Sequence, residues 1–378
     1  MNKVIYFYFS IVTILFSSLA CSGSDEFRES YNLQRAKGNS IQIDPTVLYS
    51  SGITHEELIA DQKKANITSV HYFIVSEWDG SKNDQLFKEE YINALEENNI
   101  GIWLMVLGNC FYGDTSLPQE WKMELLSPYP GNVNFYSFHN EEFVDWQVER
   151  VKRIIKNYPY LLGIEFAESY FPEWKTIHNN GFYGDVSTNA RTIFTEKYLD
   201  VHHEIPTFNE IRSDSMLYQH WQDFRVDAIV NFNLRIKEAI KSENPDMLFA
   251  TWGMGMRNAK LVEIREHFGL DMIRLASEVK PDILYIQTSA QDWGDPTLSP
   301  QYLKDYEYIV DALKSAKPEI RLGVQADIAS LSFHDDSVPK RDGEWWNEFM
   351  ELSNAVGYFT NTAYEYTFYK KQGLWVGK

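Results

Sequence analysis

The sequence predicts an α/β fold, a single (β/α)8 TIM barrel with long loops after its third and fourth strands. Three observations favour this class. Eight apolar runs of strand length are spread along the chain, helical segments lie between them, and a proline marks four of the helix-to-strand joins. The runs are nearly continuous rather than alternating, which is typical of parallel strands covered on both faces. No linker or change of composition interrupts residues 41–378, so we expect one barrel domain there.

The residues before the barrel have the pattern of an export signal. Lys3 precedes the hydrophobic run Val4–Phe16, which is too short for a bilayer span. Ser18-Leu19-Ala20-Cys21 resembles the lipobox of a bacterial lipoprotein, and the short acidic stretch after it resembles signals of surface lipoproteins in the Bacteroidota. The resemblance implies a signal peptide over 1–20, a lipidated Cys21, a tether over 21–40 and a cell-surface protein anchored in outer-membrane lipid. Cleavage without lipid, giving a secreted or periplasmic protein, is the alternative.

The predicted strands are rich in β-branched and aromatic residues. In order they are Ile41–Leu48, Ser69–Val75, Gly101–Leu107, Leu161–Ala167, Met247–Trp252, Ile283–Gln287, Arg321–Ala326 and Ala355–Phe359. The largest spacings between strand starts, 60 and 86 residues, follow the third and fourth strands. The loops Gly108–Asn140 and Ser169–Asp214 are therefore insertions at strand C-terminal ends, where barrels place their active sites.

Four helices have clear sequence signals. Thr54-His55-Glu56-Glu57 has the spacing of a capping box and predicts a helix to about Ala65. Ser299-Pro300 predicts an N-cap and a first-turn proline for a helix to about Ala316. Apolar residues recur on one face from Asn140 onward and again over 215–242. Helices end at joins that contain Pro159, Pro245, Pro281 and Pro318.

The net charge and the aromatic content of the chain limit the classes of molecule that it is expected to bind. The chain has 35 Lys and Arg against 54 Asp and Glu, a net charge of −19, which repels a phosphate backbone and argues against nucleic acid. It also has 11 Trp, 23 Tyr and 23 Phe. Rings on a concave surface suit sugars, because the C–H faces of sugars stack on them. A large core with aromatic-rich loops would explain the same content.

Two glutamates lie at the end of the fourth predicted strand. The run reads Gly163-Ile164-Glu165-Phe166-Ala167-Glu168. Glycoside hydrolysis needs two carboxyl groups flanking one bond, and a carboxylate at a strand end is costly to bury without a purpose. Glu168 is therefore the predicted general acid/base, with a salt-bridged loop residue as the alternative. Glu165, if it points into the barrel, either supports the site or is itself the acid.

The strand end and the segment Leu217–Arg225, where Trp221 and Phe224 precede Arg225, resemble barrel glycoside hydrolases of clan A, a group that includes β-galactosidases. The resemblance implies an acid/base glutamate ending the fourth strand and a nucleophile glutamate ending the seventh. This chain differs at two positions. Ala167 replaces the usual Asn before the acid/base, and the seventh run, Leu322–Ile328, contains no glutamate.

The second carboxyl group therefore has two candidates. Asp327 ends the seventh run and can act as a nucleophile or as the base of an inverting enzyme, since its side chain is one methylene shorter than that of Glu. Glu365 follows the eighth strand. Gln325 in the place of the nucleophile would instead mean an inactive barrel or substrate-assisted chemistry.

Other side chains near strand ends are expected to bind the sugar through hydroxyl contacts or ring stacking. They are Glu77, Trp78, Asp79, Glu165, Trp252, Gln287, Asp292, Trp293 and Gln325. Arg212, Arg257 and Arg341 could bind a uronate or sulfate if they converge, although the net negative charge opposes a polyanion.

Other chemistries leave little trace. The sequence has no Gly-x-Gly-x-x-Gly, Walker loop or Gly-x-Ser-x-Gly, and its His-rich runs lack helical ligand spacing, so we predict neither a cofactor nor a metal. With Cys21 in the lipobox, Cys110 is left unpaired and no disulfide framework is expected.

The predicted function is hydrolysis of a polysaccharide or oligosaccharide by two carboxyl groups. The alternatives are a non-catalytic surface glycan-binding lipoprotein and a barrel lyase or isomerase; the oligomeric state is left open.

Overall fold

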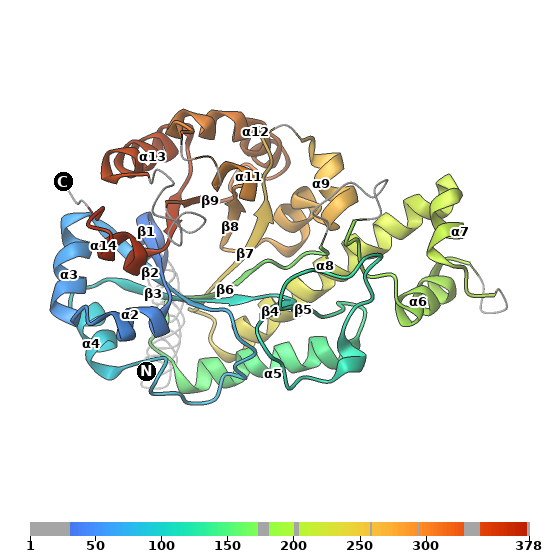
Figure 1. Ribbon diagram of the computed structural model, residues 1–378, viewed down its shortest axis with the longest axis horizontal. Coiled ribbons are helices and arrows are strands. Elements are labelled where there is room, and N and C mark those ends of the chain that lie inside the picture. The colour runs from blue at the N-terminus through green and yellow to red at the C-terminus, as the bar shows by residue number, and fades with distance from the viewer. Residues whose placement is uncertain are drawn as a thin grey trace, which may run out of the picture.

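A computed structural model describes residues 31–172, 181–199, 204–257, 259–293, 295, 297–328 and 341–375. Within these ranges eight parallel strands close into a barrel in the order β1-β10-β9-β8-β7-β6-β3-β2 (Figure 1). The predicted (β/α)8 TIM barrel is confirmed. The barrel strands are β1 (Gly38–Ile43), β2 (Ile67–Ile74), β3 (Gly101–Leu107), β6 (Gly163–Ala167), β7 (Leu248–Met254), β8 (Ile283–Gln287), β9 (Leu322–Asp327) and β10 (Thr360–Tyr364).

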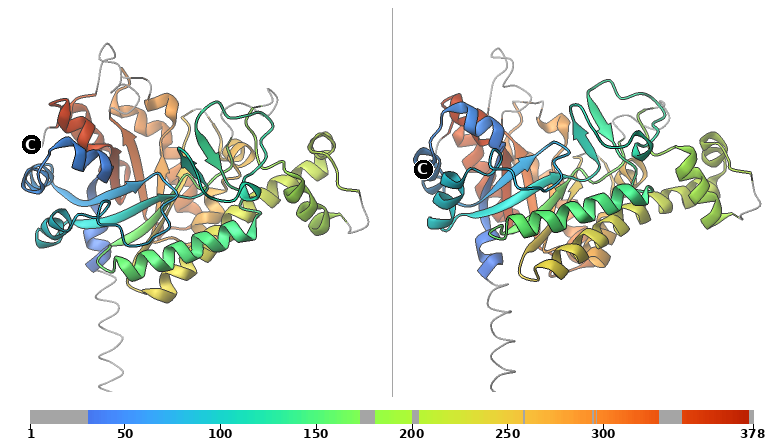
Figure 2. Two further views of the ribbon diagram at one scale, coloured as in Figure 1. Left: turned by 60° about the horizontal axis from the view of Figure 1, so that its bottom comes forward. Right: turned by 90° about the horizontal axis from the view of Figure 1, so that it is seen from below.

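Most of the helices surround the barrel and bury their apolar faces against it, and two helices in the loop after β6 project from it (Figures 1 and 2). They are α2 (Pro45–Ser51), α3 (His55–Lys64), α4 (Glu89–Glu97), α5 (Glu141–Asn157), α6 (Thr188–Tyr198), α7 (Phe208–Ser213), α8 (Ser215–Glu243), α9 (Leu261–Phe268), α10 (Met272–Arg274), α11 (Ala290–Trp293), α12 (Glu307–Ala316), α13 (Gly343–Val356) and α14 (Tyr366–Lys371). Short helical turns of other types cover Gln119–Trp121, Leu275–Val279 and Pro300–Tyr306.

The helix start signals read from the sequence are present in the structure. Thr54 and Glu57 form a reciprocal capping box at the start of α3. Asn140 accepts a hydrogen bond from the Phe143 backbone N–H at 2.9 Å and begins α5. Ser299 caps a helical segment as expected, but its first seven residues form a 3-10 helix before α12 begins at Glu307.

The first and eighth strands differ from their predicted ranges. β1 begins at Gly38 and ends at Ile43, because Asp44 caps a helix that starts at Pro45. The predicted eighth strand, Ala355–Phe359, is wrong. Helix α13 continues to Val356, Gly357 ends it with φ 98°, and the strand is Thr360–Tyr364. The sequence of β10, Thr-Asn-Thr-Ala-Tyr, is polar, so a search for apolar runs passes over it.

The two inserted loops have structure of their own. The loop after β3 contains an antiparallel hairpin of β4 (Cys110–Tyr112) and β5 (Val133–Phe135). The loop after β6 contains α6 and α7, which pack on the first turns of the long helix α8 and project from the barrel (Figure 1). This unit has a separate apolar cluster: Tyr183, Val186, Ala190, Phe194, Phe208, Ile211, Trp221 and Phe224.

The N-terminal predictions fall largely outside the described residues. The signal peptide over 1–20 and the lipidation site Cys21 lie before residue 31, where the description begins. Within the range predicted as a tether, residues 31–36 are helical and β1 begins at Gly38. Of the helices described, none is both long and apolar enough to cross a membrane.

Candidate active site

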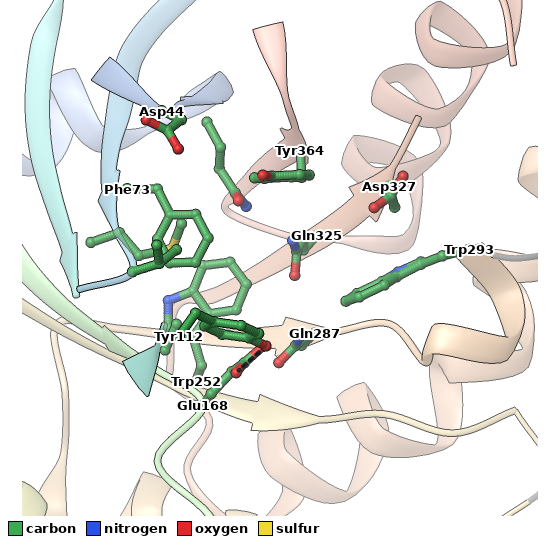
Figure 3. Close-up of a pocket in the computed structure, with 14 residues that line it drawn as sticks. Asp44, Phe73, Tyr112, Glu168, Trp252, Gln287, Trp293, Gln325, Asp327 and Tyr364 are labelled. Atoms are coloured by element: carbon green, nitrogen blue, oxygen red, sulfur yellow. Dashed lines mark hydrogen bonds between the residues drawn. The ribbon is translucent and has the colours of Figure 1, made fainter. Parts of the chain in front are cut away.

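A cavity of about 360 Å³ lies at the C-terminal ends of the barrel strands (Figure 3). Six of the predicted site residues line it: Glu168, Trp252, Gln287, Trp293, Gln325 and Asp327. The other lining residues are Gln42, Asp44, Phe73, Val75, Met105, Tyr112, Ala167 and Tyr364. The cavity therefore brings together the ends of strands that are up to about 320 residues apart in sequence.

Glu168 follows the last residue of β6 and has a left-handed backbone, with φ 52°. This conformation turns the chain out of the strand, so the side chain reaches the cavity wall. Its Oε2 accepts hydrogen bonds from the Cys110 thiol at 3.1 Å and from the Tyr112 hydroxyl at 3.5 Å. The close approach of Gly108 makes this arrangement possible, because a Cβ at Gly108 would lie 2.8 Å from Ser169 Cα.

The environment of Glu168 favours its protonated form. Burial raises the pKa of its carboxyl group above the ordinary value, and hydrogen bonds from Cys110, Gln287 and Tyr112 oppose part of that increase. A carboxyl group with a raised pKa keeps its proton closer to neutral pH, which is the property of a general acid.

Asp327 is the last residue of β9 and is 3% exposed. It pairs in register with Tyr364 of β10. Its backbone carbonyl accepts a hydrogen bond from Arg341 at 2.7 Å, which ties the strand end to the chain that follows. On the neighbouring strand Gln287 pairs with Gln325, so two amides lie side by side at the cavity (Figure 3).

Glu165 lies in the barrel interior and is not among the residues that line the cavity, so direct substrate binding is not supported for it. Its Oε2 accepts a hydrogen bond from Trp252 Nε1 at 3.1 Å, and its Oε1 contacts His71 Nδ1. His71 Nε2 lies 2.7 Å from Ser40 Oγ, whose hydrogen goes to the Asn361 carbonyl. His71 must therefore carry a hydrogen on Nε2. Glu165 holds Trp252 in place from below the cavity.

Glu365 does not meet Glu168 at the cavity either. It is 1% exposed and caps α14, accepting hydrogen bonds from the backbone N–H groups of Phe368 at 2.9 Å and Asp44 at 3.2 Å. Burial raises its pKa to about 7. Its prediction as a catalytic partner is not supported, because it is buried behind the strand ends and absent from the cavity wall.

Four further predicted sugar-binding residues hold loops instead. Glu77 accepts hydrogen bonds from Ser116, and Asp79 accepts one from the Ser81 backbone. Trp78 donates to the Ser81 carbonyl at 2.9 Å. Asp292 is 1% exposed and forms an ion pair with Arg257 at 2.5 Å. None of the four belongs to the cavity lining drawn from the described residues.

Aromatic rings line much of the cavity. Trp252 stacks on Tyr285 with centroids 4.8 Å apart, and Trp293 donates its indole hydrogen to Thr288 at 2.8 Å. Phe73 and Tyr364, which sequence analysis did not select, meet edge to face at 5.9 Å. These contacts fix the rings in place and leave apolar surface for C–H groups.

Gln42 and Asp44, at the end of β1, also line the cavity and are not among the residues predicted from the sequence. A signal was available, because Gln42-Ile43-Asp44 repeats the Gln-x-Asp spacing of Gln325-Ala326-Asp327. The first strand was predicted over residues 41–48. That range places Gln42 and Asp44 in the middle of a strand and not at its end, so the repeated spacing did not indicate a site.

The arginines considered for an anionic glycan do not reach the cavity wall. Arg257 pairs with Asp292, and Arg341 donates to the carbonyls of Asp327, Asp292 and Asp295. Arg212 is likewise outside the lining set. Within the ranges that the structure describes, no cluster of three or more His, Cys, Asp and Glu could hold a metal ion.

Comparison with known proteins places the fold. No protein-family model and no curated protein sequence matches the chain. The PgaB (BpsB) glycoside hydrolase domain from Bordetella bronchiseptica is 14% identical, with a TM-score of 0.66 over 89% of this chain and 96% of that domain. The catalytic domain of β-amylase from Paenibacillus polymyxa is 14% identical, with a TM-score of 0.60 over 87% and 92%.

A GH42 β-galactosidase from G. stearothermophilus is 12% identical, with a TM-score of 0.61 over 88% of this chain. The chain spans 51% of that β-galactosidase, about half its length. The resemblance to glycoside hydrolase barrels expected from the sequence is therefore confirmed at the level of the fold.

Proposed function

We propose that the protein hydrolyses a glycosidic bond in an oligosaccharide or polysaccharide, with Glu168 as the general acid and Asp327 as the general base. The observation that carries the proposal is the cavity itself, which has both carboxyl groups at strand C-terminal ends among stacked aromatic rings. Barrel enzymes place their catalytic groups at this end. The raised pKa of Glu168 supports its role as the acid.

In the proposed reaction Glu168 gives its proton to the glycosidic oxygen as the bond to the anomeric carbon breaks. Asp327 takes a proton from a water molecule whose oxygen attacks that carbon from the opposite face. The products are two shorter sugars, and the new hydroxyl has the inverted configuration. Inversion is supported by the short side chain of Asp327 and by the barrel order, in which β7 and β8 lie between β6, which precedes Glu168, and β9, which ends at Asp327.

The test combines a panel of oligosaccharides with two variants. Glu168→Gln and Asp327→Asn are each expected to lower the hydrolysis rate by about 10³-fold while the melting temperature changes little. Glu97→Gln and Asp84→Asn, at exposed positions outside the cavity, serve as matched controls. Proton NMR of the first product formed gives the configuration. Failure of the parent protein to cleave any glycan would overturn the proposal, and a retained configuration would overturn the role of Asp327 as base.

A second candidate function is glycan binding without cleavage. The cavity has amides, Gln287 and Gln325, at the ends of β8 and β9. An amide cannot act as a nucleophile or a base there, which would suit a barrel that only binds. Binding of an oligosaccharide by a parent protein that cleaves none of the panel would favour this candidate.

We also propose that Cys21 carries a lipid that anchors the protein in the outer membrane, facing the cell surface. The hydrophobic run Val4–Phe16 and the sequence before Cys21 support this. Metabolic labelling with an alkyne fatty acid tests it. Label is expected on the parent protein and absent from Cys21→Ala; an unlabelled parent would overturn the proposal.

A further inference from the structure

Two copies of a short motif end the strands on either side of β10. Gln42-Ile43-Asp44 runs from β1 into the cap of α2, and Gln325-Ala326-Asp327 ends β9. Side chains two residues apart on a strand point to the same face. All four polar side chains line the cavity, and Tyr364 of β10 lies between the two pairs in the barrel order. The motif therefore builds a polar wall on one side of the cavity.

The two amides of this wall are buried and incompletely bonded. Gln42 is 1% exposed and Gln325 is 6% exposed. Among the residues that the structure describes, Gln42 Nε2 and Gln325 Oε1 have no hydrogen-bond partner. A buried polar group without a partner is unfavourable, so its retention at a cavity points to a ligand that completes the bond. One group offers a donor and the other an acceptor.

The two carboxylate oxygens of Asp44 have different surroundings. Its Oδ1 accepts hydrogen bonds from Thr46 N at 2.8 Å, Thr46 Oγ1 at 2.6 Å and Val47 N at 3.2 Å, and these begin α2. Within the described part of the chain, Oδ2 accepts no hydrogen bond, so it remains for a ligand. Figure 3 shows Asp44 on the side of the cavity opposite Glu168.

We propose that Gln42, Asp44 and Gln325 form a subsite that binds one neutral hexopyranose residue through its hydroxyl groups. Each hydroxyl both donates and accepts, so it can pair with the Gln42 donor and with the acceptors on Gln325 and Asp44. The edge-to-face pair of Phe73 and Tyr364 supplies apolar surface for the C–H groups of the ring. A uronate or sulfate is excluded here, because it would bring a second negative charge to Asp44.

The subsite rests on the proposed function only in taking a sugar as the ligand; it does not require cleavage. Binding is measured by saturation-transfer NMR with the methyl hexopyranosides of glucose, galactose and mannose, and with methyl glucuronide. At least one neutral hexoside is expected to bind and the glucuronide is not. Binding of no neutral hexoside, or equal binding of the glucuronide, overturns the proposal.

Three variants test the residues. Gln42→Met and Gln325→Met keep the side-chain length and remove the amide, and Asp44→Asn keeps the capping oxygen while replacing Oδ2 with a donor. Each is expected to weaken binding of the hexoside about tenfold, the effect of one lost hydrogen bond. Gln85→Met, at an exposed position, is the matched control. Because Asp44 is half-buried and keeps its cap, Asp44→Asn remains informative if a buried glutamine variant does not fold.

The outcomes separate this proposal from hydrolysis. A parent protein that cleaves a glycan with a KM unchanged by Gln42→Met and Asp44→Asn overturns the subsite and leaves hydrolysis standing. A parent protein that cleaves nothing, yet binds a hexoside that these variants release, overturns hydrolysis and supports the subsite.

Discussion

The Cys110 thiol donates a hydrogen bond to Glu168 Oε2 across 3.1 Å, and the Tyr112 hydroxyl reaches the same oxygen at 3.5 Å. Both donors belong to β4, in the loop inserted after β3. The inserted hairpin therefore fixes the orientation of a carboxyl group that the end of β6 supplies. Cys110 is the free cysteine of the described residues, and it is buried at this contact.

Cys110→Ala removes a hydrogen bond that favours the ionised form of Glu168, so the pKa of Glu168 rises further. If Glu168 is the general acid, the basic limb of the kcat/KM profile is expected to move to higher pH by about 0.5–1, which corresponds to one hydrogen bond of about 1 kcal/mol. Cys110→Ser keeps a donor and is the control. A basic limb that stays in place in the Ala variant, or moves equally in both, contradicts this role.

Substitutions of Glu165, which contacts His71, test whether this glutamate has a structural role or a catalytic one. Glu165→Leu leaves His71 and Trp252 without their partner in the barrel interior and is expected to lower the free energy of unfolding by about 3–5 kcal/mol. Glu165→Gln is expected to cost about 1 kcal/mol or less, because its amide can donate to His71 Nδ1 and its oxygen can accept from Trp252. Urea unfolding measures both changes.

The same Glu165→Gln variant is expected to keep hydrolysis within about threefold of the parent, since Glu165 lies below the cavity. A loss of about 10³-fold in a variant with parental stability would instead make Glu165 the general acid.

Because Glu365 is buried, we expect the free energy of unfolding to fall between acidic and neutral pH. Its pKa rises from 4.5 to about 7 on folding because the carboxyl group is buried. Its contribution is fully present below about 4.5 and is lost as the pH rises through about 7, up to a limit of about 3 kcal/mol. The free energy of unfolding should fall less steeply over this range in Glu365→Gln. Glu97→Gln should keep the parental slope, and an unchanged slope in Glu365→Gln would refute the assignment.

Gly108 is predicted to be intolerant of a side chain. A methyl group there would lie 2.8 Å from Ser169 Cα, on the residue that follows Glu168. Gly108→Ala is therefore expected to displace Glu168, lower hydrolysis about tenfold or more and cost about 1–3 kcal/mol of stability. Gly131→Ala, where the nearest atom belongs to the Tyr129 side chain, is the control. Parental activity in Gly108→Ala would show that the close approach is not required.

Most of the barrel could be predicted from the sequence because most of its strands are apolar. Seven predicted strands overlap strands of the structure, and the eighth does not, since β10 places Thr and Asn where apolar residues were expected. The polar side chains of β10 bind the neighbouring strand β1. Thr360 Oγ1 donates to the Gly38 carbonyl at 2.8 Å, and Asn361 Nδ2 donates to Asn39 Oδ1 at 2.9 Å. Because these partners lie 322 residues away in sequence, the sequence alone does not distinguish this polar strand from a loop.

The site was predicted unevenly for a similar reason. Glu168, Gln287 and Asp327 lie at the cavity because each is at or next to the end of a correctly placed strand, and the end of a parallel strand indicates where the side chain lies. Asp44 was missed through the misplaced end of β1, and Tyr112 because its role depends on how an inserted hairpin folds back over β6. Glu365 was selected for its position in the sequence, and only the capping contacts reveal its other role.

The separate apolar cluster of α6, α7 and the start of α8 has a wider consequence. The boundary with the barrel core falls between Phe224 and Val226, and Arg225 lies at that boundary, donating to the carbonyls of Glu266 and His267. Because the inserted unit satisfies its own apolar residues, its sequence can diverge, shorten or lengthen without repacking the eight strands. Substitutions within this unit are therefore expected to cost the barrel core little stability.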